Sequence, residues 1–159
     1  KAVDSGATTT PVETPAEDTT DADAAEKARL EAERIKAEEE ERARAAARAD
    51  FSNEDIYFEF DSASLLPMAQ DLLSKKAGYM LAMSGISVTI EGHGDERGTD
   101  AYNMALGERR AEAAKAFLVN LGISPSQITT ISYGEERPMD TAKNEAAWAK
   151  NRRAHFVIN

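Results

Sequence analysis

The chain has 159 residues, a length that suits one domain of ordinary size together with an appendage. Its formal net charge of -10 argues against binding to nucleic acid or to anionic lipid, because an acidic surface repels phosphate groups. The chain contains no cysteine, which excludes disulfides, thiolate nucleophiles and cysteine metal sites within it.

The first fifty residues hold the most polar part of the chain. Residues 1–20 consist mainly of Thr, Ala, Pro and acids with two valines, so nothing offsets the entropy of ordering them and we expect a disordered tether. Residues 21–50 are nearly all Ala, Glu, Arg and Lys with opposite charges at helical spacing, which predicts a charged helical spacer. Leu30 and Ile35 are its only large aliphatic residues. A solvated helix is therefore favoured over the alternative, a coiled coil.

The pattern from residue 51 onward is typical of a globular α/β domain, which we place at 51–159. Alternating or β-branched and aromatic residues predict strands, and apolar residues at helical spacing predict helices. The expected strands are 56–60, 86–92, 127–134 and 152–158, and the expected helices are 65–83, 101–122 and 144–151. The predicted order is β-α-β-α-β-α-β.

An arginine interrupts the apolar face of the second of these helices. Steps of four, three, four and four residues place on one stripe Leu106, Arg110, Ala113, Phe117 and Leu121. A guanidinium cannot shed its proton there and must find an anion or reach solvent, because an unpaired buried charge is costly. The glycine-rich turn 92–100 just before the helix offers nearby carboxylates. Two interpretations stay open: an internal ion pair, or an open site whose acid and base together grip a zwitterion.

Other chemistries fit this turn poorly. Its glycines at 92, 94 and 98 do not match the dinucleotide-binding pattern G-x-G-x-x-G. A metal site at His93, Asp95 and Asp100 is disfavoured because no zinc spacing recurs in the chain. Hydrolysis would require opposed catalytic carboxylates, a G-x-S-x-G elbow or a nucleophilic cysteine, and none is present as a motif. We therefore expect a protein that is not an enzyme and that needs neither cofactor nor metal.

Four segments, in order, resemble one known family. They are FEFDSASL (58–65), EGHGDERGTDAYNMALGERRAEAAKAFL (91–118), ISYGEERP (131–138) and EAAWAKNRRAHFVI (145–158). Together they resemble the OmpA-like peptidoglycan-binding domain, and the second segment is highly specific for it. The resemblance implies an α+β sandwich with helices packed on a mixed four-stranded sheet. It also implies noncovalent binding of peptidoglycan through the meso-diaminopimelate of its stem peptide.

The resemblance further implies roles for individual residues. Asp95 occupies the position of the carboxylate that meets the side-chain ammonium of diaminopimelate, and Arg110 that of the cation that takes the carboxylate of the same residue. Arg110 coincides with the base found on the helix stripe, and Asp95 is one of the carboxylates in the turn before it. The remaining pocket positions implied by the resemblance are Phe60, Asp61, Arg97, Thr99, Asn103 and Leu106.

Family resemblance also suggests partners and a location. It implies a component of the Tol machinery of cell division and envelope integrity, with a TolB-like β-propeller protein as a second partner. The alternative function is an envelope protein-interaction module for which wall binding is secondary. The implied location is the periplasmic face of the outer membrane of a Gram-negative bacterium, reached through an N-terminal lipid on a cysteine that the chain as printed does not contain.

Overall fold

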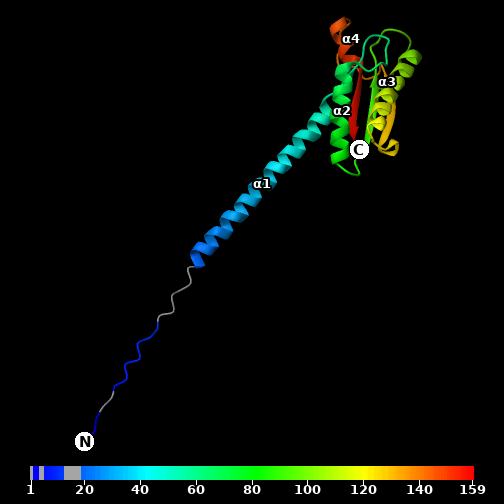
Figure 1. Ribbon diagram of the computed structural model, residues 1–159. Helices are drawn as coiled ribbons and strands as arrows, with labels where there is room; N and C mark the ends of the chain where they lie inside the picture. Colours follow the sequence, from blue (N-terminus) through cyan, green and yellow to red (C-terminus); the bar gives the residue numbers. More distant parts are fainter. Residues whose placement is uncertain (1, 4–5, 13–18) are drawn as a thin grey trace. The chain divides into compact units, whose positions relative to one another are not determined.

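The N-terminal part of the chain contains one long helix. The computed structural model describes residues 2–3, 6–12 and 19–159, and the other residues of the expected tether, 1, 4–5 and 13–18, lie outside the described residues. Residues 2–3 and 6–12 form neither helix nor strand. Helix α1 (Thr19–Asn53) begins just inside the predicted tether and ends three residues beyond the predicted spacer (Figure 1).

Charged side chains dominate α1. Arg34 bonds Glu31 and, at 2.6 Å, Glu38, so opposite charges pair at helical spacing as the sequence predicts. The side chains of Leu30 and Ile35 are 52% and 43% exposed. None of the described helices combines the length and the apolar character needed to cross a membrane.

Residues Ala43–Asn159 form the larger of the two compact units into which the chain divides. The sheet has four strands in the order β1-β4-β2-β3. Their bounds are β1 (Ile56–Tyr57), β2 (Val88–His93), β3 (Ile128–Gly134) and β4 (Arg153–Ile158). Strands β2 and β3 are parallel, and β4 is antiparallel to both β1 and β2. The predicted mixed four-stranded sheet is therefore confirmed.

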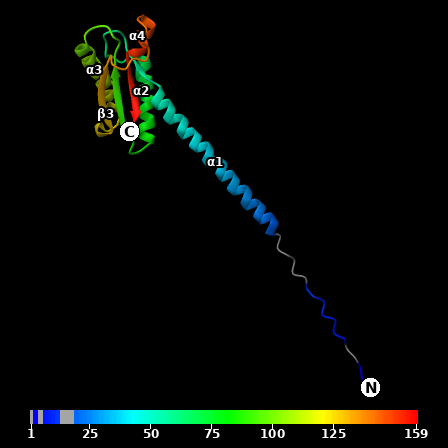
Figure 2. The same cartoon turned by 180° about the vertical axis from the view of Figure 1, so that it is seen from behind.

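The helices of this unit follow the predicted order. They are α2 (Pro67–Ala82), α3 (Asp100–Asn120) and α4 (Glu145–Asn151), with one 3-10 turn at Pro125–Gln127. In Figures 1 and 2, α2 and α3 lie beside each other on one side of the sheet. The core between these layers is aliphatic and aromatic, and its fully buried members include Ile56, Leu73, Val88, Ile90, Leu118 and Phe156.

The first strand is shorter than predicted. Residues 58–60 were expected to continue it, but β1 ends at Tyr57. The amide of Phe58 still donates to the carbonyl of Arg152 at 3.0 Å. A few residues later Asp61 adopts a positive φ of 50°, which turns the chain away from the extended direction. The segment that leaves the sheet here forms one wall of the candidate site described below.

The apolar stripe predicted on α3 is correct only in its first part. Leu106 and Arg110 are buried, whereas Leu121 caps the helix and is 42% exposed. Over the steps from residue 106 to residue 121 the stripe drifts by about 60° around the helix. The buried face continues instead through Ala111, Ala114 and Leu118.

Two glycines bring α3 very close to β2. A Cβ added at Gly92 would lie 1.7 Å from the carbonyl oxygen of Gly107, so neither strand nor helix leaves room for a side chain there. This contact lies one residue before the end of β2 and one helical turn before Arg110. The contact therefore fixes the position of the Arg110 guanidinium along β2, relative to the end of that strand.

The last turn of α1 belongs to the core of the larger unit. Phe51 is 4% exposed, and its ring centroid lies 5.0 Å from that of Tyr79 and 5.8 Å from that of Phe156. The buried ammonium of Lys76 donates to the carbonyl of Phe51 and lies over both phenylalanine rings. These contacts anchor the end of the helix to α2 and β4.

Truncation tests the proposed domain boundary at residue 51. Removing residues 1–42 should leave the thermal midpoint unchanged, because the larger unit begins at Ala43. Removing residues 1–50 should lower the midpoint by several degrees and the free energy of unfolding by about 1 kcal/mol. The three helical residues that remain cannot hold Phe51 in a helix by themselves. Melting curves followed by circular dichroism measure both. Equal midpoints for the two truncations would place the boundary at residue 51.

Candidate binding site

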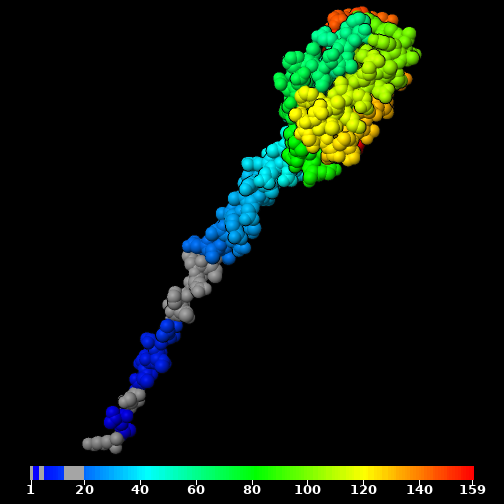
Figure 3. Space-filling model, turned by 45° about the vertical axis from the view of Figure 1, so that its right-hand side comes forward, coloured from blue at the N-terminus to red at the C-terminus, as the bar shows by residue number. Residues whose placement is uncertain are grey.

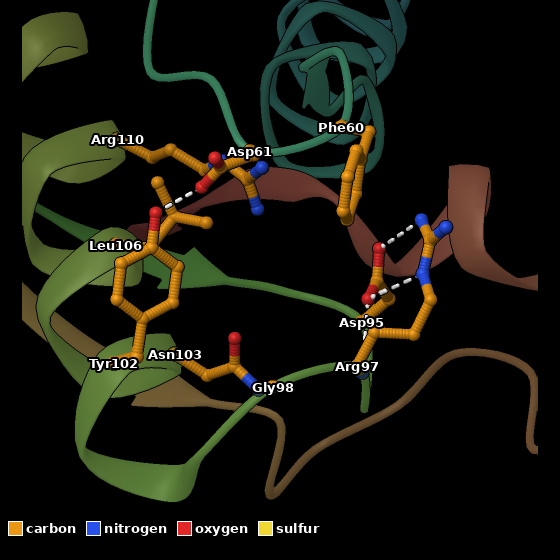
Figure 4. A pocket seen from close by; sticks show the side chains of 9 residues that line it. All are labelled: Phe60, Asp61, Asp95, Arg97, Gly98, Tyr102, Asn103, Leu106 and Arg110. Carbon is orange, nitrogen blue, oxygen red and sulfur yellow. Dashed lines mark hydrogen bonds and ion pairs between the residues drawn. The ribbon is translucent and has the colours of Figure 1, made fainter.

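A pocket of about 180 Å³ opens beside the end of β2 and the start of α3. Its walls come from the segment after β1, from the turn between β2 and α3, and from the first three turns of α3 (Figure 4). The residues that line it are Phe60, Asp61, Asp95, Arg97, Gly98, Tyr102, Asn103, Leu106 and Arg110. The structure thus brings together seven of the eight residues expected from the sequence.

Thr99 is the expected residue that does not line the pocket. Its Oγ1 accepts a hydrogen bond of 3.1 Å from the amide of Tyr102, so Thr99 is the N-cap of α3. Sequence reasoning missed Gly98 and Tyr102. Tyr102 lies four residues before Leu106, which the resemblance places in the pocket, so helical spacing from Leu106 could have indicated Tyr102.

Arg110 is held by backbone carbonyls. The side chain is 1% exposed, and it donates from Nε to Ser62 O at 2.9 Å, from Nη1 to His93 O at 2.9 Å and from Nη2 to Glu59 O at 3.1 Å. Burial lowers the pKa of Arg110 to about 10, although the negative charges of Asp95 and Asp61 raise it. Arg110 therefore stays charged at neutral pH. Among the described residues no carboxylate lies within ion-pair distance of Arg110. The interpretation of this arginine as part of an internal ion pair is therefore wrong.

Three donors of Arg110 are used in this way and two remain. The carbonyls belong to the segment after β1 and to the last residue of β2, so the guanidinium ties that segment to the sheet. Figure 3 shows the blue-green and green surface of the chain leading into α2 directly beside the yellow-green surface of α3. The buried cation therefore contributes to the shape of the pocket as well as to its charge.

Asp95 has two arginine partners, one in its own turn and one at the end of α4. It is 6% exposed, and its Oδ1 accepts from the amide and Nε of Arg97 at 3.0 and 3.1 Å while its Oδ2 accepts from Nη2 of Arg97 at 2.9 Å. Nη1 of Arg152 lies 3.7 Å from Oδ2. Burial by itself would raise the pKa of Asp95, but the hydrogen bonds and charge of Arg97, with the charge of Arg152, lower it overall. The carboxylate is therefore ionised at neutral pH.

Two aromatic rings enclose the side chain of Arg97. Its guanidinium carbon lies 4.0 Å from the ring centroid of Phe60 and 4.1 Å from that of Trp148. The indole N–H of Trp148 donates to Glu96 at 2.9 Å, which fixes the ring against the turn. This arrangement gives the pocket an aromatic and cationic rim.

The rest of the pocket wall carries an acid, an amide and an aliphatic side chain. Asp61 accepts a hydrogen bond from the hydroxyl of Tyr102 and holds a left-handed backbone conformation that is strained for a residue other than glycine. Asn103 is 3% exposed and its side chain lies beside the carboxylate of Glu135, while Leu106 supplies buried apolar surface. The pocket thus presents a buried cation and carboxylates from separate elements, an arrangement that suits a zwitterionic ligand.

His93 does not join a metal cluster. It is 2% exposed and stacks on Tyr133 with ring centroids 5.6 Å apart. No group of three or more His, Cys, Asp or Glu side chains placed to hold a metal occurs in the part of the chain that the structure describes. Burial, helped by the charges of Arg153, His155 and Arg137, lowers the pKa of His93 to about 3.

The low pKa of His93 predicts a loss of stability in acid. An unfolded histidine titrates near pH 6.5, so between that value and about pH 3 the unfolded chain binds a proton that the folded chain does not. The contribution is fully present above pH 6.5 and is lost as the pH falls, by about 1–2 kcal/mol near pH 5. Urea unfolding at pH 7 and pH 5 should show a smaller loss in the variant His93→Phe. Equal losses in both proteins would contradict this assignment.

Comparison with known proteins places this chain in one family. The OmpA family matches residues 57–152, and the chain belongs to that family. It is 53% identical over 101 residues to the peptidoglycan-associated lipoprotein of Pseudomonas aeruginosa, an alignment that covers 64% of this chain and 60% of that protein. With the protein of the same name from Brucella melitensis it shares 46% identity over 104 residues, which is 65% of this chain and 62% of that protein. The chain thus spans less than two thirds of the length of these curated relatives.

Solved structures agree with this placement. The crystal structure of the peptidoglycan-associated lipoprotein from Burkholderia pseudomallei matches with a TM-score of 0.64 at 42% identity, covering 66% of this chain and 89% of that one. The C-terminal domain of Helicobacter pylori MotB matches with a TM-score of 0.63 at only 18% identity, covering 67% of this chain and 84% of that chain, and so shares the fold.

Proposed function

We propose that this chain binds peptidoglycan noncovalently through the meso-diaminopimelate of its stem peptide. The observation that carries the proposal is that one cavity holds a buried cation, Arg110, and an ionised carboxylate, Asp95, that are not paired with each other. Diaminopimelate ends in an ammonium and a carboxylate on the same carbon, which requires one group of each sign. The names of the relatives at 46% and 53% identity support the same ligand class.

Each pocket residue has a part in this proposal. The two free N–H groups of Arg110 take the ligand carboxylate, and Asp95 takes the ammonium. Asn103 offers its side-chain amide to a ligand carbonyl, and Leu106 packs against the methylene chain of diaminopimelate. Phe60 and Arg97 form the rim, and Asp61 adds a second carboxylate. The function is binding without catalysis.

The proposal extends to the cell envelope. Relatives named as lipoproteins support an N-terminal lipid anchor on the periplasmic face of the outer membrane. Helix α1 has 35 residues and by itself spans about 50 Å, a length that suits a link between membrane and wall. We place the chain accordingly in the Tol-Pal system of cell division and envelope integrity, with a TolB-type propeller as a second partner at the same surface.

Co-sedimentation with purified sacculi tests the proposed ligand. Sacculi with diaminopimelate in the stem peptide should pull down the chain, whereas sacculi with lysine in that position, which lacks the second carboxylate, should not. A TolB-type propeller added in excess should then release the bound chain. Equal sedimentation with both kinds of sacculi would mean that the stem peptide is not what the pocket recognises.

A further inference from the structure

Asp95 already holds a cation within the protein. All three hydrogen bonds to its carboxylate come from Arg97, two on Oδ1 and one on Oδ2. Two of them come from the guanidinium, in a bidentate pairing like the one an arginine makes with any free carboxylate. A ligand ammonium would therefore meet an oxygen pair that is occupied.

The two arginines near Asp95 differ in freedom. The side chain of Arg152 is 7% exposed and is fixed by a 2.9 Å bond from its Nε to Phe58 O. The side chain of Arg97 is 30% exposed and lies on the pocket rim. It lies between the rings of Phe60, which is 58% exposed, and Trp148, and neither ring belongs to the hydrophobic core, so Arg97 can leave Asp95 without disturbing the core.

A second carboxylate lies near Arg97. Oε1 of Glu145, at the start of α4, accepts a hydrogen bond of 2.9 Å from Nη2 of Arg152, but Oε2 lies 4.0 Å from Nη2 of Arg97, and the Glu145 side chain is 67% exposed. An arginine that swings outward can strengthen this contact while the bond from its own backbone amide to Asp95 stays in place. The turn therefore need not unfold when the guanidinium moves.

We propose that Arg97 is an internal competitor for Asp95, a latch that a ligand ammonium must displace before the pocket can bind. This inference rests on the proposed function and adds to it a device that sets affinity and selectivity. A neutral ligand group cannot compensate for the loss of the ion pair between Arg97 and Asp95. An ammonium can, because it replaces one positive partner of Asp95 by another. If Asp95 is free about a tenth of the time, the apparent affinity is about tenfold weaker than that of the open pocket.

Substitution of Arg97 tests the latch. Arg97→Met removes the charge and the guanidinium that lies between the Phe60 and Trp148 rings but leaves an apolar side chain beside them, and it should bind a diaminopimelate-containing muropeptide about tenfold more tightly than the unchanged protein in calorimetric titration. Arg97→Lys, which keeps the charge but loses the fork, should give a smaller gain. The matched control Arg48→Met removes an exposed arginine of α1 outside the pocket and should leave affinity unchanged.

A second ligand distinguishes an effect of the charge of Arg97 from an effect of its size. The same muropeptide with its diaminopimelate amine acetylated, titrated to millimolar concentration, should bind the unchanged protein and Arg97→Met equally weakly. An equal gain for both ligands would make Arg97 a steric obstacle and overturn the latch. Unchanged or weaker binding of the free amine by Arg97→Met, with normal binding by the unchanged protein, would overturn the latch and leave the proposed function intact. Failure of the unchanged protein to bind either ligand would overturn both.

Discussion

Replacing Arg110 with lysine should weaken muropeptide binding by at least about a hundredfold and also lower the free energy of unfolding by about 2–4 kcal/mol. The guanidinium satisfies three buried carbonyls at once, and one ammonium cannot meet the same three acceptors and still present a fork to a ligand carboxylate. Calorimetric titration and urea unfolding measure the two effects.

The adjacent residue of the same helix provides the control for this change. Arg109 is exposed, so Arg109→Lys should alter neither binding nor stability by more than about 0.5 kcal/mol. Binding must be measured at a temperature at which Arg110→Lys is folded, so that lost affinity is not mistaken for lost protein. A folded Arg110→Lys protein with unchanged affinity would remove this residue from the site.

Replacing Asp95 with asparagine should weaken muropeptide binding by about tenfold or more. The amide keeps the shape of the side chain and one acceptor oxygen, but it no longer offers a charge to an ammonium, and charge-assisted bonds are worth roughly 1.5–3 kcal/mol. Stability should fall less than affinity, because the exposed Arg97 can turn to solvent or to Glu145. Parallel titration and thermal melting separate the two quantities.

Asp100→Asn provides a charge-matched control for Asp95→Asn. It removes an exposed acid from the first turn of α3, five residues away and outside the pocket, and it should leave affinity nearly unchanged. If Asp95→Asn bound the muropeptide normally while losing several kcal/mol of stability, Asp95 would be a purely structural partner of Arg97 and Arg152.

Local sequence patterns suffice for most elements of the fold. Alternation in 86–92 predicts β2, and apolar spacing predicts α3, because both patterns follow from which face of the element is buried. The end of β1 was harder to predict, because residues 58–60 continue the aromatic, strand-like composition although the strand ends at Tyr57 and the chain turns soon afterwards at Asp61. The end of α1 depends in the same way on the packing of Phe51 against distant residues.

The site, like the fold, can be predicted from local sequence patterns only where it does not depend on distant residues. Periodicity places an arginine on the buried face of α3, but it cannot say that the acceptors are Glu59 and Ser62, which lie 51 and 48 residues earlier in the chain. One of the two interpretations left open by the sequence was an ion pair between Arg110 and a carboxylate of the turn. In the structure Asp95 pairs with Arg97 instead, because the turn folds back on itself. Arg110, on α3, lies against backbone carbonyls and donates to them.

The most direct measurement compares two ligands on two proteins. A stem tripeptide that ends in meso-diaminopimelate differs from one that ends in lysine by a single carboxylate, the group assigned to Arg110. In calorimetric titration the unchanged protein should prefer the diaminopimelate peptide by about a hundredfold, and Arg110→Lys should bind both peptides alike and weakly. The same preference in both proteins would contradict the account, because the carboxylate would then be recognised elsewhere.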